Sequence, residues 1–335
     1  MVGGLQRDIT VVFLSESDDP YLFKICDELY PYVGDRVRFW KICSPFSFPK
    51  AGKEKFFVLN RIGRYGIRSL AHDWLLNLMS DSKRRFVYYA CDVPVSDLAL
   101  EFMERSTVIL VNTDEMKSYL CSLNESFRDK IEVVPLHISF DFVNGVLPLK
   151  RIDDRFHILW FSLSGTGMSD VAKLLKDLDL LNLYVRVICI CNRVGILRSK
   201  VEPVQNVDVM YFEALPYKDL IAFCKMCDVI IYPVFDDLDN VSFKVKPPTK
   251  FLNAVAVKKV LLVSPLKYYR EVADGRSVIL VNDDSWIDVL LSVVKSNADY
   301  VYDEKAYLDA RSKFDSVKLC SEYMKVYLGG EHAAS

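Results

Sequence analysis

A loop of small residues near the middle of the chain has the composition of a phosphate-binding turn. It reads Ser162-Leu-Ser-Gly-Thr-Gly-Met-Ser-Asp170 and lies between an expected strand, His157–Phe161, and an expected helix. Glycine lets a ligand approach the backbone, and the N–H groups at a helix start attract anions. An ordinary strand–helix turn with Ser169 or Asp170 as N-cap is the alternative. The residues expected to surround a diphosphate are Ser164, Gly165, Thr166 and Gly167.

A lysine-rich segment farther along the chain could supply positive charge to the same anion. Pro247 and Pro248 predict a helix start, so Lys250 and Asn253, three residues apart, should share one helical face. We expect that face to look toward the glycine loop, where a lysine can neutralise a departing diphosphate and an asparagine can bind a ribose hydroxyl. A solvated lysine-rich loop is the alternative. Further candidates for positive charge are Lys244, Lys246 and Arg193.

An aspartate in the first half of the chain has the position of a catalytic carboxylate. Asp92 closely follows the apolar run Phe86–Tyr89, so it should lie at the carboxyl end of a strand. A carboxylate placed there can bind a sugar hydroxyl or take its proton. A strand-end turn or a helix cap is the alternative. His137 follows Pro135 and could face a ligand in the cleft or be structural.

The segment 36–68 is strongly basic, with nine lysine and arginine residues against Glu54 alone, or a net charge of +8. Arg61 and Arg64 follow an expected strand, so they could reach a phosphorylated ligand such as a lipid diphosphate. Peripheral contact with an anionic membrane is a second interpretation, because each basic residue near such a surface contributes about 1 kcal/mol. A solvated face is the third.

Short apolar runs alternate with helical periodicity along the chain, which indicates an α/β fold. Several runs are apolar throughout, as expected of parallel strands with helices on both faces. The expected strands are 9–14, 37–42, 56–59, 86–89, 108–111, 132–134, 157–161, 185–191, 207–212, 229–232, 260–264 and 277–280. The expected helices include 21–32, 67–79, 95–105, 114–123, 217–227, 248–257 and 286–295.

The alternation divides the chain in two. It restarts at His157, after a charged, proline-containing connection at Asp141–Asp154. We therefore predict an N-terminal domain at residues 1–150, a C-terminal domain at 151–302 and a helical tail at 303–335. Ligands of doubly wound sheets bind outside the carboxyl ends of the strands, so a site is expected in the cleft between the two domains.

Four motifs follow one another through the second half of the chain. They are the strand–glycine loop–helix of 157–170, Tyr211-Phe-Glu213, Cys227-Asp-Val…Pro233, and Lys250-Phe-Leu-Asn-Ala…Lys259-Val-Leu-Leu-Val-Ser264. In this order they resemble the donor domain of glycosyltransferase family 4, the group 1 transferases. The donor-domain resemblance lies in residues 155–295. Resemblance to the family covers most of the chain, is strong from 207 to 290 and is only topological before residue 85.

The resemblance implies the GT-B fold, in which two Rossmann-like doubly wound domains face each other across a cleft and a C-terminal crossover helix packs back on the N-domain. It implies that the C-terminal domain binds a nucleoside diphosphate sugar, UDP- or GDP-linked, with Glu213 among the donor-binding residues. The N-terminal domain would bind the acceptor hydroxyl of a glycan or a lipid-linked sugar. The sugar would be transferred without a metal or other cofactor and with retention at the anomeric carbon.

The sequence departs from the family pattern at the donor site. Asn253 stands at the second of two expected glutamates and Val245 at the first, while Leu163 and Met168 replace the usual basic residues of the glycine loop. A GT-B pseudoenzyme that binds a partner or regulates a complex is therefore an alternative, as is a nucleotide-sugar epimerase. A dehydrogenase is disfavoured because no strand is followed by the GxGxxG fingerprint.

The bulk composition fits two ordinary globular domains. The chain has 335 residues, of which 51% are hydrophobic, and its net charge of −2 gives no reason to expect a nucleic-acid partner. Nine scattered cysteines are typical of free thiols, and the CxxC of Cys224 and Cys227 lacks the second pair that zinc would need. With neither a signal pattern nor an apolar run of about 18 residues, the expected location is cytoplasmic, with peripheral contact at the inner membrane face left open.

Overall fold

The computed structural model describes residues 11–15, 37–41, 55–60, 62–63, 66–94, 96–162, 167–181, 183–201, 204–213, 215–235, 240–296 and 302–329. The chain divides into two compact units. Unit 1 comprises Met1–His137, Val245–Pro247 and Ser316–Ser335, and unit 2 comprises Ile138–Lys244 and Pro248–Asp315. Each predicted strand has a counterpart whose ends differ by two residues at most, whereas the helix expected over 21–32 lies outside the described residues.

Unit 1 contains a parallel sheet with the strand order β2-β1-β3-β4-β5-β6. Its strands are β1 (Val11–Ser15), β2 (Val37–Lys41), β3 (Phe56–Asn60), β4 (Arg85–Tyr89), β5 (Val108–Val111) and β6 (Ile131–Val133). Strands β1, β3 and β5 are buried along their whole length, which explains why they are continuous apolar runs. Each face of the sheet therefore needs a helical cover.

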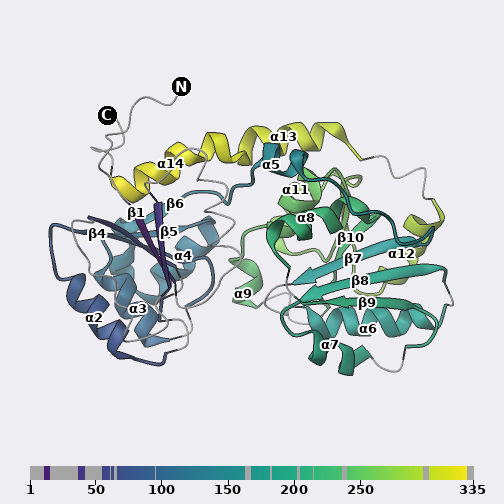
Figure 1. Ribbon diagram of the computed structural model, residues 1–335, viewed down its shortest axis with the longest axis horizontal. Coiled ribbons are helices and arrows are strands. Elements are labelled where there is room, and N and C mark those ends of the chain that lie inside the picture. The colour runs from purple at the N-terminus through teal and green to yellow at the C-terminus, as the bar shows by residue number, and fades with distance from the viewer. Residues whose placement is uncertain are drawn as a thin grey trace. The chain divides into compact units, whose positions relative to one another are not determined.

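The helices of unit 1 are α2 (Leu70–Leu78), α3 (Asp97–Arg105), α4 (Asp114–Leu123), the 3₁₀ helix η2 (Glu125–Lys130) and α14 (Ser316–Leu328). Hydroxyl caps set two of the starts: Ser96 accepts a hydrogen bond from the Ala99 N–H, and Thr113 accepts one from the Met116 N–H. Helix α14 packs against β3 and β4, on the opposite side of the sheet from α2 and α3 (Figure 1).

Unit 2 contains a second parallel sheet, with the strand order β12-β11-β10-β7-β8-β9. Its strands are β7 (Phe156–Ser162), β8 (Val185–Cys191), β9 (Asp208–Phe212), β10 (Val229–Tyr232), β11 (Val260–Val263) and β12 (Val278–Leu280). The order is that of the Rossmann fold, and the direction in which strands are added reverses between β7 and β10.

Helices cover both faces of the unit 2 sheet, with α6 and α7 on one side and α8 on the other (Figure 1). The helices are α5 (Phe140–Gly145), α6 (Met168–Asp179), α7 (Val194–Val201), α8 (Tyr217–Met226), α9 (Val241–Lys244), α10 (Thr249–Ala256), α11 (Lys267–Val272), α12 (Trp286–Lys295) and α13 (Glu304–Phe314). Trp160 of β7 and Trp286 of α12 lie in the core under α6.

The C-terminal tail is two helices rather than the single segment expected, because α13 ends at Phe314 and α14 begins at Ser316. Helix α13 belongs to unit 2, whereas α14 belongs to unit 1, as a crossover helix does in the GT-B fold. The Tyr327 ring packs edge-on against Phe13, with ring centroids 5.4 Å apart, and Arg85 donates to the Val326 carbonyl.

The first unit also ends earlier than residue 150. Helix α5 is part of unit 2, because the Phe140 ring packs edge-on against Tyr307 of α13 at 5.3 Å between centroids. The Ile138 N–H donates to the Phe314 carbonyl at 3.0 Å, and Lys225 Nζ donates to the Asn144 carbonyl at 3.2 Å. The connection expected at Asp141–Asp154 is thus largely docked on unit 2.

Candidate functional site

The carboxyl ends of β7 and β10 lie next to each other in the middle of the unit 2 sheet. This is the point where the strand order reverses, and ligands of open parallel sheets bind outside the carboxyl ends of the strands at such a point. Two of the residues singled out in the sequence, Gly167 and Lys250, lie at these strand ends.

Gly167 is the N-cap of α6 and has a left-handed backbone, with φ of 78°. A Cβ atom at this position would lie 3.2 Å from the Pro233 carbonyl oxygen and 3.8 Å from Cε2 of Tyr232. The turn therefore needs glycine both for its φ angle and for its close packing on the end of β10. Because α6 begins at Met168, the N-cap named in the alternative interpretation of this loop, Ser169 or Asp170, is wrong.

Lys250 lies in the first turn of α10, with a partly buried side chain. The helix begins at Thr249 with Pro248 as its N-cap, which confirms the start predicted from the two prolines. The Lys250 Nζ lies 4.3 Å from the ring centroid of Tyr232 and 5.9 Å from that of Phe161. Tyr232 is the last residue of β10 and Phe161 the penultimate residue of β7, so the ammonium group lies near the two strand ends.

Asn253 lies in the interior, unlike Lys250. Its side chain is only 1% exposed, and its Oδ1 accepts a hydrogen bond of 3.0 Å from the Tyr217 hydroxyl of α8. The spacing of three residues was read correctly as one helical turn, but the face carrying Asn253 packs on α8. The expected contact with a ribose is therefore not supported by the position of Asn253.

Arg193 and Glu213 follow β8 and β9, and both are exposed at the same edge of the sheet. Burial raises the pKa of the nearby Cys191 thiol, a hydrogen bond from the Arg193 backbone lowers it, and the Glu213 charge raises it. Arg193 and Glu213 thus lie just beyond the carboxyl ends of β8 and β9.

The remaining lysines of the predicted donor site divide between the units. Lys244 ends α9 and is exposed. Lys246 lies in the segment Val245–Pro247, which belongs to unit 1. In that unit the Thr113 hydroxyl donates to the Val245 carbonyl at 2.9 Å.

Five of the predicted site residues lie outside the described residues: Ser164, Gly165, Thr166, Arg61 and Arg64. The described parts of the loop that carries Arg61 and Arg64 are firmly packed. Gly63 has φ of 76°, and a Cβ there would lie 3.0 Å from the Ala99 nitrogen. The Tyr88 hydroxyl donates to the Ile62 carbonyl at 2.8 Å.

The two acceptor-side candidates of unit 1 lie in different surroundings. Asp92 is partly buried, in the short connection between β4 and α3. His137 is 1% exposed, and its ring packs edge-on against Tyr323 of α14 with centroids 4.8 Å apart. His137 is thus part of the core under α14, which favours the structural interpretation.

A buried hydrogen-bonded network in unit 1 was not foreseen from the sequence. Asn112 accepts from the Tyr89 hydroxyl at 2.7 Å and donates to the Val134 carbonyl and to the Tyr323 hydroxyl, both at 2.9 Å. The Tyr323 hydroxyl donates to the Pro135 carbonyl at 3.0 Å. Burial raises the pKa of Tyr89. The network fixes α14 to the ends of β4 and β5.

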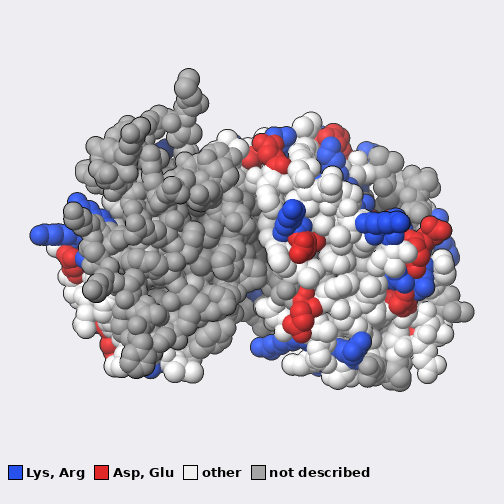
Figure 2. Space-filling model, in the orientation of Figure 1, with Lys and Arg blue, Asp and Glu red and all other residues white. Residues whose placement is uncertain are grey.

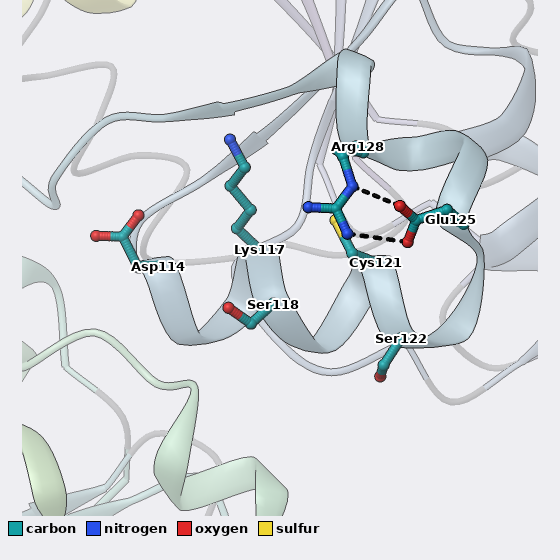
Figure 3. Close-up of a pocket in the computed structure, with 7 residues that line it drawn as sticks. All are labelled: Asp114, Lys117, Ser118, Cys121, Ser122, Glu125 and Arg128. Atoms are coloured by element: carbon teal, nitrogen blue, oxygen red, sulfur yellow. Dashed lines mark hydrogen bonds and ion pairs between the residues drawn. The ribbon is translucent and has the colours of Figure 1, made fainter.

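A cavity of about 480 Å³ lies on the outer face of α4 and η2 (Figure 3). Its charged lining residues are Asp114, Lys117, Glu125 and Arg128, so their formal charges cancel. Arg128 forms a bidentate ion pair with Glu125. None of the predicted site residues lines this cavity, and its charges point to no ligand.

Comparison with solved structures finds proteins of similar fold along nearly the whole chain. WaaG, a glycosyltransferase involved in lipopolysaccharide biosynthesis, is 15% identical with a TM-score of 0.65, over 96% of this chain and 100% of that chain. An α-glucosyltransferase in complex with UDP and a 13-mer DNA containing an HMU base is 11% identical with a TM-score of 0.65, over 95% and 98%. A putative UDP-N-acetylglucosamine 2-epimerase from Listeria monocytogenes is 8% identical with a TM-score of 0.54, over 98% of each chain. No protein family model and no curated protein matches the sequence.

The chain has the GT-B fold. The two parallel α/β sheets and the full-length likeness to glycosyltransferase structures together establish this. Within this fold, Gly167 and Lys250 lie at the point of the unit 2 sheet where the strand order reverses.

The opposite edge of the unit 2 sheet, at the amino ends of its strands, carries a dense group of ion pairs. Arg151 binds both carboxylate oxygens of Asp228, at 2.7 and 2.9 Å, and Arg186 Nε binds Asp208 at 2.8 Å. Burial, and next the Arg151 charge, lower the pKa of His157. In this GT-B domain the first ion pair connects the chain at 151 to the residue before β10, and the second joins the starts of β8 and β9.

The described surface carries charges of both signs. Figure 2 shows basic and acidic side chains interspersed over the described face of unit 2, without a patch of one sign. Among the described residues, no helix is both long and apolar enough to cross a bilayer. The same part of the chain contains no cluster of three or more His, Cys, Asp or Glu residues suited to a metal ion.

Proposed function

We propose that this GT-B protein is a glycosyltransferase that moves a hexose-like sugar from a UDP- or GDP-linked donor to a hydroxyl of a glycan or lipid-linked acceptor. The observation that carries the proposal is that Gly167 and Lys250 both lie next to the Tyr232 ring, at the strand-reversal point of unit 2. A helix N-terminus with a glycine cap and an ammonium group attract the same ligand, which is a diphosphate. The similar structures support sugar-nucleotide chemistry on this fold.

We assign the remaining groups of the proposed donor site from their positions in the chain and in the fold. The diphosphate lies at the start of α6, next to Ser164, Gly165, Thr166 and Gly167. Lys250 lies on one side of it, and Arg193 and Glu213 lie at the neighbouring strand ends. Lys244 and Lys246 are the further basic groups we assign to the donor.

The proposed chemistry relies on fixed positive charge and not on a metal. When the bond between the sugar and the phosphate breaks, negative charge grows on the phosphate oxygens. An ammonium group held in place interacts more strongly with that charge than with the intact donor, so it lowers the barrier. We propose that Asp92 binds or deprotonates the acceptor hydroxyl and that transfer retains the anomeric configuration.

We propose that the protein acts in the cytoplasm. We further propose that the basic segment 36–68, with Arg61 and Arg64, recognises a phosphorylated or lipid-linked acceptor. This segment would also make peripheral contact with the inner membrane face. Flotation with vesicles containing anionic lipid, compared with neutral vesicles, tests the membrane contact. Replacing Arg61 and Arg64 together with glutamine should reduce binding to the anionic vesicles, while binding equal to that of the unchanged protein would contradict this role.

A panel of UDP, GDP and their common sugar conjugates tests the donor site. A true ligand at 100 times its Kd adds about 2.7 kcal/mol to the free energy of unfolding, which thermal denaturation detects. Product analysis by mass spectrometry then separates the alternatives. Transfer to an acceptor supports the proposal, turnover to an isomeric nucleotide sugar would identify an epimerase, and binding without any turnover would identify a pseudoenzyme.

A further inference from the structure

The Lys250 ammonium lies over an aromatic pair. Its Nζ is 4.3 Å from the ring centroid of Tyr232 and 5.9 Å from that of Phe161. Both distances are within the range, up to about 6 Å, in which a cation is attracted to the face of an aromatic ring. The two rings come from the last residue of β10 and the penultimate residue of β7, the strands on either side of the reversal point.

The Tyr232 ring is held on several sides. The residue is 4% exposed, and its ring packs against Tyr269 with centroids 6.4 Å apart. Its Cε2 lies 3.8 Å from the position that a Cβ would occupy at Gly167. Its carbonyl accepts a hydrogen bond from the Ser264 N–H. One ring thus contacts both the glycine cap of α6 and the ammonium group of Lys250.

A flexible lysine loses side-chain entropy when it is fixed at a phosphate, and this weakens binding. An aromatic face attracts the ammonium group through its quadrupole and leaves the net charge of the lysine unchanged. A carboxylate would attract the same group but would also cancel its charge toward an anion. The ring can therefore restrict the position of the lysine before the ligand binds, without itself neutralising the ammonium charge.

We propose that Tyr232, assisted by Phe161, is a positioning residue that holds the Lys250 ammonium at the donor diphosphate. This inference rests on the proposed function, since it concerns the same site. It assigns a role in phosphate binding to two aromatic residues, Tyr232 and Phe161, at the ends of buried strands. A substitution of Tyr232 should then change the affinity for a ligand only when Lys250 is present and only when the ligand carries phosphates.

The test is a double-mutant cycle on nucleoside diphosphate affinity, with Tyr232→Leu, Lys250→Met and the double variant. The probes are UDP, GDP and the matching nucleosides, measured by calorimetry. Tyr232→Leu should weaken diphosphate binding about 3- to 30-fold, or about 0.7–2 kcal/mol at 1.4 kcal/mol per tenfold, and should leave nucleoside binding unchanged. In the Lys250→Met background it should have no further effect, and Tyr232→Phe should bind like the unchanged protein.

A second lysine–tyrosine pair in unit 2 provides the matched control. Lys258 Nζ lies 4.4 Å from the ring centroid of the buried Tyr307, after the C-terminal end of α10. Tyr307→Leu should lower the melting temperature as Tyr232→Leu does, without changing diphosphate affinity. If Tyr232→Leu does not fold, phenylalanine analogues with increasing fluorination at position 232 keep the ring shape and weaken its negative face, so affinity should fall in steps.

The outcomes separate the inference from the proposed function. Diphosphate binding that needs Lys250 but responds equally to Tyr232→Leu and Tyr307→Leu would overturn the positioning role and leave the donor site in place. An equal loss on Tyr232→Leu with and without the Lys250→Met substitution would also overturn it, because the ring would then act independently of the lysine. Failure of the unchanged protein to bind any nucleoside diphosphate would overturn the proposed function itself.

Discussion

Replacing Lys250 with alanine should abolish most of the transfer rate while preserving the fold. The change removes a charge that lies over the ends of β7 and β10, together with its contact to the Tyr232 ring at 4.3 Å. Loss of one fixed electrostatic donor typically costs about 3–4 kcal/mol in the transition state, or roughly 100- to 1,000-fold in rate. Loss of the ring contact costs about 1–2 kcal/mol of stability. For a unit of this size that corresponds to a fall of roughly 2–8 °C in Tm.

The assay measures kcat and KM on the donor identified by the ligand panel, with thermal denaturation alongside. Because the charge acts mainly when the phosphate leaves, the loss should be mostly in kcat. Lys258→Ala is the matched control, since this lysine also lies over a ring, at 4.4 Å from the Tyr307 centroid, and forms an ion pair with Glu304 at 2.8 Å. It should show a similar change in Tm with no change in rate.

Two results would refute the reasoning. A Lys250→Ala variant within threefold of the unchanged rate would show that Lys250 does not stabilise the leaving phosphate, and Lys244, Lys246 and Arg193 would be tested next. A variant that loses activity only in proportion to its loss of folded protein would show that Lys250 acts through stability alone.

Three further predictions concern the stability of the two units. Gly167→Ala should destabilise unit 2 by about 1–3 kcal/mol in urea denaturation, since φ is 78° and the new Cβ would lie 3.2 Å from the Pro233 oxygen; an unchanged midpoint would contradict this. Asn112→Ala should cost about 1–3 kcal/mol by leaving the buried Tyr89 hydroxyl without its acceptor, whereas a surface change such as Lys117→Ala should stay within about 0.5 kcal/mol. Burial lowers the pKa of His157 below the usual 6.5, so its contribution to stability is complete above pH 6.5 and is lost as the pH falls through the lowered value; His157→Gln should flatten that part of the stability profile, and an equally steep profile would exclude His157 as its source.

The sequence by itself determined the elements of this fold. The strands Val108–Val111 and Val229–Tyr232 were predicted at the bounds they have, because a parallel strand with both faces covered is apolar along its length. The start of α10 was predicted from two prolines, whose missing N–H groups and fixed φ suit the first positions of a helix. The resemblance of residues 155–295 to a donor domain likewise pointed to the GT-B fold.

Only the tertiary structure decided which side chains meet. Local spacing places Lys250 and Asn253 within one turn of a helix, but it cannot show that the second packs on Tyr217 of α8 while the first lies over Tyr232. The histidine after β6 could equally have faced a ligand, and its burial depends on Tyr323, which is 186 residues further along the chain. Such contacts join residues that are distant in sequence and fix no local pattern, because hydrophobic packing selects for size and polarity and not for a particular neighbour. The helical character of the tail was predicted from its local sequence pattern. Its break at Asp315 and the packing of α14 on β3 and β4 are seen only in the tertiary structure.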